Sequence, residues 1–363
     1  MAFDAIIAGA GIIGSSIAWR LAQQRLRVLL VDAGRMGGEA SSAGAGMLAP
    51  GGEIESSSPW SDFALASLRL YPEYVAELET ETGCPIDFQR LGAVEVALSE
   101  EEWKSLEERG RRQSDAGIPS SALTARELAE ELPLARRDLA GARFYPQDSL
   151  VDPRDILRAL RAGCLRLGVQ IREGTTITEI QPATGEAMVQ AGGTRYQAAV
   201  VVLAAGAWSD QIRVKSVDLV PTYPVRGHLL AYRLPPASLG PILRHGPTYL
   251  LQRANGFTIA GTSSEQAGFD RTLSPAIVAD IQSRAGGLLP ALSGRRPDEQ
   301  WLGFRPAVNR DTPIVGRAGE TALWLAYGHY RNGILLAPET ARRIASGIMA
   351  NSERDLSARP GTP

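Results

Sequence analysis

The feature that most constrains the fold is a glycine-rich turn between an apolar strand and a helix at the start of the chain. Residues 3–8 form an apolar run, residues 13–26 carry apolar side chains at helical spacing, and residues 28–31 form another buried strand. Between the first two lies Gly9-Ala10-Gly11-Ile12-Ile13-Gly14, which satisfies G-x-G-x-x-G. The pattern predicts a βαβ unit. Gly9 would make the tight turn, Gly11 would let the backbone approach a pyrophosphate, and Gly14 would allow close packing of the helix on the strand.

This turn also predicts the ligand. Free N–H groups and the dipole at a helix N-terminus favour a phosphate, and Asp32, after the second strand, can accept hydrogen bonds from ribose hydroxyls. The turn does not separate FAD from NAD, because both contain an ADP moiety. The small-residue segment 38–47, GEASSAGAGM, is typical of close backbone contact with a long flavin and therefore favours FAD.

Composition excludes several other classes of protein. The chain has 363 residues, enough for two lobes around a cleft, and 44% of them are hydrophobic and 21% charged. The formal net charge is −2 without basic runs, so we expect no nucleic-acid partner. Because we find neither a run long enough to span a membrane nor a leader, we expect a cytoplasmic protein. Cys84 and Cys164 lack disulfide or metal spacing and are expected to be reduced, buried thiols.

The remaining patterns divide the chain between two domains of an α/β fold, α+β overall. A buried strand over 196–206 and a helix over 332–350 belong with the first strands, whereas alternating runs between 225 and 260 predict an antiparallel sheet that forms a cleft wall. We expect a discontinuous, Rossmann-like FAD-binding domain, a substrate domain and a polar tail. Their ranges are 1–83, 150–220 and 303–350 for the first, 84–149 and 221–302 for the second, and 351–363 for the tail.

Five ordered segments resemble the D-amino acid oxidase family of flavoproteins, and the resemblance extends over nearly the whole chain. They are GAGIIGSSIAWRLA, SSAGAGML, VVLAAGAWS, LGFRPAVNRDTPIVG and GHYRNGILLAP. The resemblance implies noncovalent FAD, because covalent relatives use a cysteine near the segment that aligns with 303–313 and this chain has none there. The expected cofactor-binding residues are Gly9, Gly11, Ile12, Ile13, Gly14, Asp32, Ala33, Ala40, Ser41, Ala45, Gly46, Met47, Ile177, Gly206, His329, Tyr330, Arg331, Asn332, Gly333, Ile334 and Leu335.

The resemblance also implies where an amino acid substrate binds. Arg305, in LGFRP, matches the arginine that holds the substrate carboxylate, and a planar guanidinium can do so with two parallel hydrogen bonds. Tyr249 matches a tyrosine that lends its hydroxyl to the same group. Arg331 and Met47 are expected nearby. Ser264 stands where relatives can carry a methionine, which predicts a wider or more polar pocket.

The chain is most similar to the glycine-oxidising members of the family that serve thiamine thiazole synthesis. This implies oxidation of glycine, sarcosine or small D-amino acids such as D-alanine by hydride transfer to flavin N5, with no acid–base residue required. The products would be a 2-oxo acid such as glyoxylate, ammonia or an amine, and hydrogen peroxide from molecular oxygen. Relatives suggest a homotetramer. Three alternatives stay open, namely a D-amino acid dehydrogenase, a sarcosine oxidase-like enzyme and a noncatalytic flavin-binding module.

Overall fold

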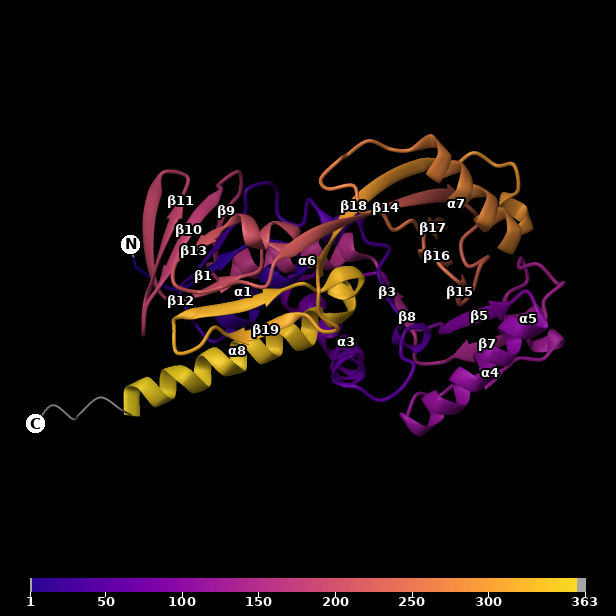
Figure 1. The fold of residues 1–363 in the computed structure, drawn as a ribbon, viewed down its shortest axis with the longest axis horizontal. Coiled ribbons are helices and arrows are strands. Elements are labelled where there is room, and N and C mark those ends of the chain that lie inside the picture. Colours follow the sequence, from indigo (N-terminus) through magenta and orange to yellow (C-terminus); the bar gives the residue numbers. More distant parts are fainter. Residues whose placement is uncertain (1, 358–363) are drawn as a thin grey trace, which may run out of the picture.

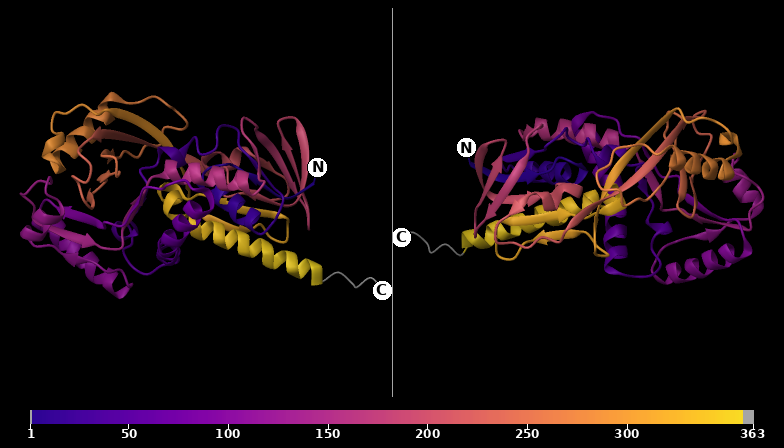
Figure 2. Two further views of the ribbon diagram at one scale, coloured as in Figure 1. Left: turned by 180° about the vertical axis from the view of Figure 1, so that it is seen from behind. Right: turned by 45° about the horizontal axis from the view of Figure 1, so that its top comes forward.

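The computed structural model describes residues 2–357, which form two lobes built on separate large sheets (Figure 1). Both the first strand and the last helix belong to one lobe, and the second lobe lies beyond the short strands β3 and β8. Figure 2 shows the same two lobes from behind and from above. Within residues 2–357, no helix is long and apolar enough to cross a membrane, and no group of His, Cys, Asp and Glu side chains could hold a metal ion.

The first lobe is built on a nine-stranded sheet with a parallel centre. β1 (Ala2–Ala8) pairs in parallel with β2 (Val28–Val31) and with β12 (Thr194–Leu203), and β12 pairs in parallel with β20 (Leu323–Tyr327). The main strand order is β13-β10-β11-β12-β1-β2-β9. The other strands are β9 (Gln170–Arg172), β10 (Ile177–Pro182), β11 (Ala187–Ala191), β13 (Arg213–Val214) and β19 (Ile314–Arg317).

Both faces of this sheet are buried, as its continuous apolar strands require. Along β1 and β2, Ile7 and Leu30 pack against the helices, whereas Ile6 and Leu29 pack on the opposite face with residues of β10 and β11. The covering helices are α1 (Ile12–Gln23), α3 (Pro59–Thr82), α6 (Pro153–Arg166) and α8 (Gly333–Ser357).

Local sequence sets where these helices begin. At α6, the Asp152 side chain accepts a hydrogen bond from the Arg154 N–H at 2.9 Å, and Pro153 occupies the first turn. At α3, Ser58 forms a capping box with Ser61.

The second lobe is built on an eight-stranded sheet in the order β18-β14-β17-β16-β15-β5-β7-β6. Its pairs are antiparallel except β15 with β5. One face packs against α5 and α7, and the other faces the first lobe through β3 and β8. The strands are β5 (Ala93–Ala97), β6 (Ser121–Ala122), β7 (Gly141–Tyr145), β14 (Thr222–Arg233), β15 (Ile242–His245), β16 (Thr248–Gln252), β17 (Phe257–Gly261) and β18 (Glu299–Val308). The helices are α4 (Glu100–Asp115), α5 (Ala125–Glu131) and α7 (Pro275–Leu288).

Short elements join the lobes. β8 (Ser149–Val151) lies between β3 (Met47–Leu48) and β4 (Phe88–Gln89) in a three-stranded sheet. The predicted small-residue segment contains one helical turn, α2 (Ala40–Ala43). The 3₁₀ helices are η1 (Pro50–Gly52), η2 (Gly206–Gln211), η3 (Pro290–Leu292) and η4 (Tyr330–Asn332).

The predicted α/β fold with an antiparallel second sheet is confirmed, and two local predictions are wrong. The last helix does not end at residue 350 but continues to Ser357, because residues 351–359 contain no glycine or proline to stop it. Residues 358–363 of the predicted tail lie outside the described part of the chain. Cys164 is buried as expected, but Cys84 is only partly buried, because it directly follows Gly83 at the exposed end of α3. The domain ranges stay a prediction.

Candidate active site

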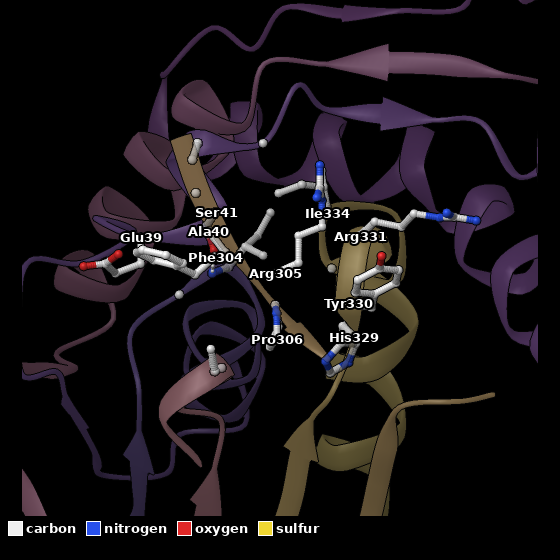
Figure 3. A pocket seen from close by; sticks show the side chains of 18 of the residues that line it. Glu39, Ala40, Ser41, Phe304, Arg305, Pro306, His329, Tyr330, Arg331 and Ile334 are labelled. Atoms are coloured by element: carbon white, nitrogen blue, oxygen red, sulfur yellow. Dashed lines mark hydrogen bonds between the residues drawn. The ribbon is translucent and has the colours of Figure 1, made fainter. Parts of the chain in front are cut away.

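A cavity of about 980 Å³ runs between the lobes, from the ends of β1, β2 and β10 to the inner face of the second sheet. Its walls include all of the predicted cofactor and substrate residues except Gly14 and Leu335. Figure 3 shows part of this wall, where β18 passes between the α2 turn and the segment around His329.

The glycine turn has the geometry that its sequence predicts. Gly9 has a φ of +106°, and a Cβ there would lie 2.4 Å from the carbonyl oxygen of Ala204. A Cβ on Gly14 would lie 1.9 Å from the carbonyl oxygen of Gly9. Gly14 therefore allows α1 to approach the turn closely, although it does not line the cavity.

The N-terminus of α1 faces the cavity, and side chains hold the surrounding loops in place. The Ile12 N–H donates to Ser41 Oγ at 2.9 Å, which ties the α2 turn to the helix. Asp32 accepts from the Ala10 N–H at 2.7 Å and from the Gly34 N–H at 2.8 Å. The Asp32 carboxylate thus braces the glycine turn while it lines the cavity at the end where an ADP moiety would bind.

The small-residue segment approaches the cavity through its backbone. Gly46 has a φ of +87°, and a Cβ there would lie 1.9 Å from the carbonyl oxygen of Val151. The buried Arg253 donates to this carbonyl at 2.5 Å and also to the carbonyl of Ala45. Sequence analysis missed Arg253, because it is one arginine among many and its partners are backbone atoms.

The segment 329–335 turns from β20 into α8 beside the cavity. His329 is buried with Nε2 3.0 Å from Thr340 Oγ1, and burial lowers the pKa of His329 to about 3, so its imidazole is neutral. Leu335 lies in the core behind the turn, where its carbonyl accepts the Ser67 hydroxyl at 2.7 Å. Of the predicted 329–335 contacts, those up to Ile334 line the cavity.

Arg305 and Tyr249 lie over glycines of neighbouring strands. A Cβ on Gly227 of β14 would lie 2.4 Å from Arg305 Nη2, and a Cβ on Gly261 of β17 would lie 2.3 Å from Tyr249 Cζ. Burial raises the pKa of Tyr249 to about 12, although Arg305 acts in the opposite direction. The phenol is therefore protonated at neutral pH and can donate a hydrogen bond.

The Arg305 guanidinium is oriented by the segment after β17. Nη1 donates to the Ser263 carbonyl at 2.9 Å and Nη2 to Thr262 Oγ1 at 2.8 Å. A guanidinium has five N–H donors, so others are left for a carboxylate. Thr262 and Ser263 were not predicted as partners of Arg305, although the neighbouring Ser264 was predicted to lie at the substrate pocket.

The other predicted substrate residues have different surroundings. Arg331 Nε forms an ion pair with Glu53 at 3.0 Å, Asn332 donates to the same carboxylate at 2.9 Å, and the Arg331 side chain extends away from Arg305 (Figure 3). Ser264 Oγ lies 3.4 Å from the Tyr330 hydroxyl. Glu53 is a further residue that sequence analysis missed, and its link to 331–332 joins two walls of the cavity.

The residues present fit FAD. The helix N-terminus and the glycine turn suit a diphosphate, Asp32 suits a ribose, and the close-packed backbone at Gly46 leaves the cavity free for a flat ring system beside the neutral His329. Neither Cys84 nor Cys164 is among the residues that line the cavity.

The sequence is similar to that of known FAD-dependent enzymes. The family model DAO, described as FAD dependent oxidoreductase, matches residues 4–346. Glycine oxidase of Geobacillus kaustophilus is 34% identical over 347 residues, which cover 94% of this chain and 92% of the relative. The bifunctional protein ThiO/ThiG of Synechocystis sp. is 34% identical over 355 residues, covering 95% of this chain but 51% of that protein.

Solved structures give the same result. The crystal structure of glycine oxidase from Geobacillus kaustophilus has a TM-score of 0.91 at 32% identity, and the match covers 96% of this chain and 95% of that one. The predicted cofactor and enzyme class are confirmed. The chain belongs to the D-amino acid oxidase (DAO) family of FAD-dependent oxidoreductases.

Proposed function

We propose that this enzyme oxidises glycine and other small amino acids, with molecular oxygen as the electron acceptor. The observation that carries the proposal is the Arg305 guanidinium, which lies at the inner face of the second sheet, near Tyr249, with donors left for a carboxylate. The similarity to glycine oxidases at about one third identity supports glycine as substrate.

The residues of this chain would bind and orient the substrate. Arg305 would hold the carboxylate through two N–H groups, and the Tyr249 hydroxyl would donate to the same group. When bound, FAD supplies the two-electron oxidation by accepting a hydride at N5. The amine must be neutral to become an imine, and water then converts the imine of glycine to glyoxylate and ammonia. Oxygen takes up the two electrons and becomes hydrogen peroxide, so no protein acid or base is required.

The pocket would also accept slightly larger amines. Ser264, close to the Tyr330 hydroxyl, has a small polar side chain in place of the methionine that relatives can carry. Sarcosine would give glyoxylate and methylamine, and D-alanine would give pyruvate and ammonia.

Anaerobic mixing of the holoenzyme with glycine, sarcosine or D-alanine tests the proposal. We expect the flavin absorbance near 450 nm to be bleached by at least one of them, and to return on admission of air with stoichiometric peroxide. A flavin that none of the three bleaches would refute the proposed reaction. Bleaching followed by very slow recovery of the absorbance in air would instead identify a dehydrogenase, whose reduced flavin passes its electrons to an acceptor other than oxygen.

We also propose, on resemblance alone, a homotetramer that acts in the cytoplasm and contributes to thiamine thiazole synthesis. Light scattering after size-exclusion chromatography tests the tetramer. Growth without thiamine of a bacterial strain that lacks its own glycine oxidase, with and without this enzyme, tests the pathway. FAD is proposed to be noncovalent, and acid precipitation should then leave the flavin in the supernatant.

A further inference from the structure

The orientation of Arg305 depends on a segment that is not part of its own strand. Both terminal nitrogens of the guanidinium bind residues just after β17, namely the Thr262 hydroxyl and the Ser263 carbonyl. Whatever holds residues 262–263 therefore also fixes the direction of the guanidinium.

This segment is held against β14 by His228. Thr262 Oγ1 donates to the His228 carbonyl at 3.0 Å, and the His228 N–H donates to Ser263 Oγ at 2.9 Å. The His228 side chain is fully buried. Its Nε2 accepts the Ser274 N–H at 3.1 Å, so the ring proton of the neutral imidazole is on Nδ1.

Glu265 lies where these contacts meet. Its Oε1 accepts from Ser263 Oγ at 2.7 Å and from His228 Nδ1 at 2.9 Å. Its Oε2 accepts from Arg226 Nη2 at 2.6 Å and from Nε at 3.2 Å. Backbone hydrogen bonds of 2.9 and 3.0 Å between Arg226 and Glu265 fix the same position. Each carboxylate oxygen of Glu265 thus faces only hydrogen-bond donors. The donors to Oε1 come from Ser263, which lies in the segment that orients Arg305, and from His228, which binds that segment.

We propose that Glu265 is a positioning residue for substrate binding, which acts through Ser263 and His228 to aim the Arg305 guanidinium. The inference rests on the proposed function of Arg305. Glu265 is not among the residues that line the cavity. It holds the segment that supplies both acceptors of Arg305.

Glu265→Gln tests this role with little change of shape. Glutamine has only one acceptor oxygen, so its NH₂ group must face either Arg226 or the pair His228 and Ser263. Because all of these groups donate to Glu265, the hydrogen bonds on the side that the NH₂ group faces are lost. Asp270→Asn is the matched control. Asp270 pairs with the same Arg226, at 2.6 Å from Nη1, but makes no hydrogen bond to residues 262–264 and is half exposed.

The first measurement is the affinity of each holoenzyme for glycolate, which carries the carboxylate of glycine without its amine, followed through the flavin spectrum. We expect E265Q to weaken glycolate binding on the order of tenfold, and D270N by less than about threefold, at equal FAD content. Glycine KM should rise in E265Q by a similar factor, while kcat changes far less. Equal glycolate affinity in E265Q and D270N would overturn the proposal.

A double-mutant cycle separates positioning from general loosening of the fold. The quantity is kcat/KM for glycine, taken from the slope at low substrate, so saturation is not needed. Because Glu265 acts through Arg305, E265Q should lower kcat/KM about tenfold in the wild type but less than about twofold in the R305A background. Equal effects in both backgrounds would show that Glu265 does not act through Arg305.

A separate measurement shows whether Arg305 itself binds the substrate carboxylate. If R305A binds glycolate as tightly as the wild type, Arg305 is not the carboxylate site. Should E265Q not retain FAD, Ser263→Ala takes its place, because it removes the hydroxyl that Glu265 holds and keeps the Glu265–Arg226 pair. An S263A enzyme with unchanged glycolate affinity would then overturn the proposal.

Discussion

The Arg305→Ala substitution removes the group on which the proposed substrate site depends. A carboxylate held by two N–H groups of a guanidinium gains roughly 1.5–3 kcal/mol from each hydrogen bond to a charged group. Loss of both, partly offset by water that enters the open cavity, corresponds to about 3–5 kcal/mol. We therefore expect kcat/KM for glycine to fall roughly 150- to 5000-fold.

FAD binding should survive this change. Arg305 interacts with Thr262 and Ser263, whereas the ADP end of the cavity is built around the glycine turn and Asp32. The acceptors that Arg305 leaves behind face the cavity, where water can replace it, so we expect a loss of stability of no more than about 1–2 kcal/mol.

The assay is steady-state peroxide production together with the ratio of flavin to protein absorbance. Arg271→Ala is the matched control, because Arg271 also lines the cavity but pairs with Glu39 at 2.7 Å and has a side chain that is 60% exposed. We expect R271A to retain kcat/KM within about threefold. An R305A enzyme that loses its flavin, while the remaining holoenzyme keeps its KM for glycine, would refute the assignment.

Three further predictions follow from particular contacts. Gly14→Ala places a Cβ 1.9 Å from the Gly9 carbonyl oxygen and should abolish FAD binding or folding. Gly287→Ala, at an exposed position of α7 with no atom within 4 Å of the new Cβ, should leave the FAD content and the thermal midpoint unchanged or slightly raised. Tyr249→Phe should weaken glycolate binding about 3- to 10-fold without altering the pH profile between pH 6 and 10, because the pKa of Tyr249 is raised to about 12. Burial raises the pKa of Asp148 to about 6 from an ordinary 3.8, so the folded state binds this proton more tightly than the unfolded state. Protonated Asp148 therefore contributes about 3 kcal/mol to the free energy of unfolding below pH 4, and this contribution is lost as the pH rises to 6. The difference in unfolding free energy between wild type and Asp148→Asn should change over the same pH range.

Parts of both lobes were predictable because their signals are local. The βαβ unit of the first lobe and the alternating strands of the second sheet each depend on residues close together in the chain. The glycine turn is the clearest case, since the tasks predicted for Gly9 and Gly14 correspond to atoms that a Cβ would strike.

Many contacts of the candidate site could not be predicted from residues that are neighbours in the sequence. Arg253 and Arg305 bind backbone carbonyls, and a carbonyl gives no residue-type signal in the sequence. Glu53 could not be assigned either, because its partners at 331–332 become neighbours only when the last helix returns to the first lobe.

Gly227 lies inside β14, and Gly261 is the last residue of β17. Glycine weakens a strand interior and therefore marks a place where something approaches closely. Gly227 and Gly261 gave no such indication in the sequence, since they lie in alternating runs typical of any half-buried sheet. In the fold each is the surface over which a functional side chain passes, Arg305 over the first and Tyr249 over the second. Because either Cβ would lie within 2.5 Å of that side chain, the inner face of the sheet is shaped to hold Arg305 and Tyr249 before any substrate arrives.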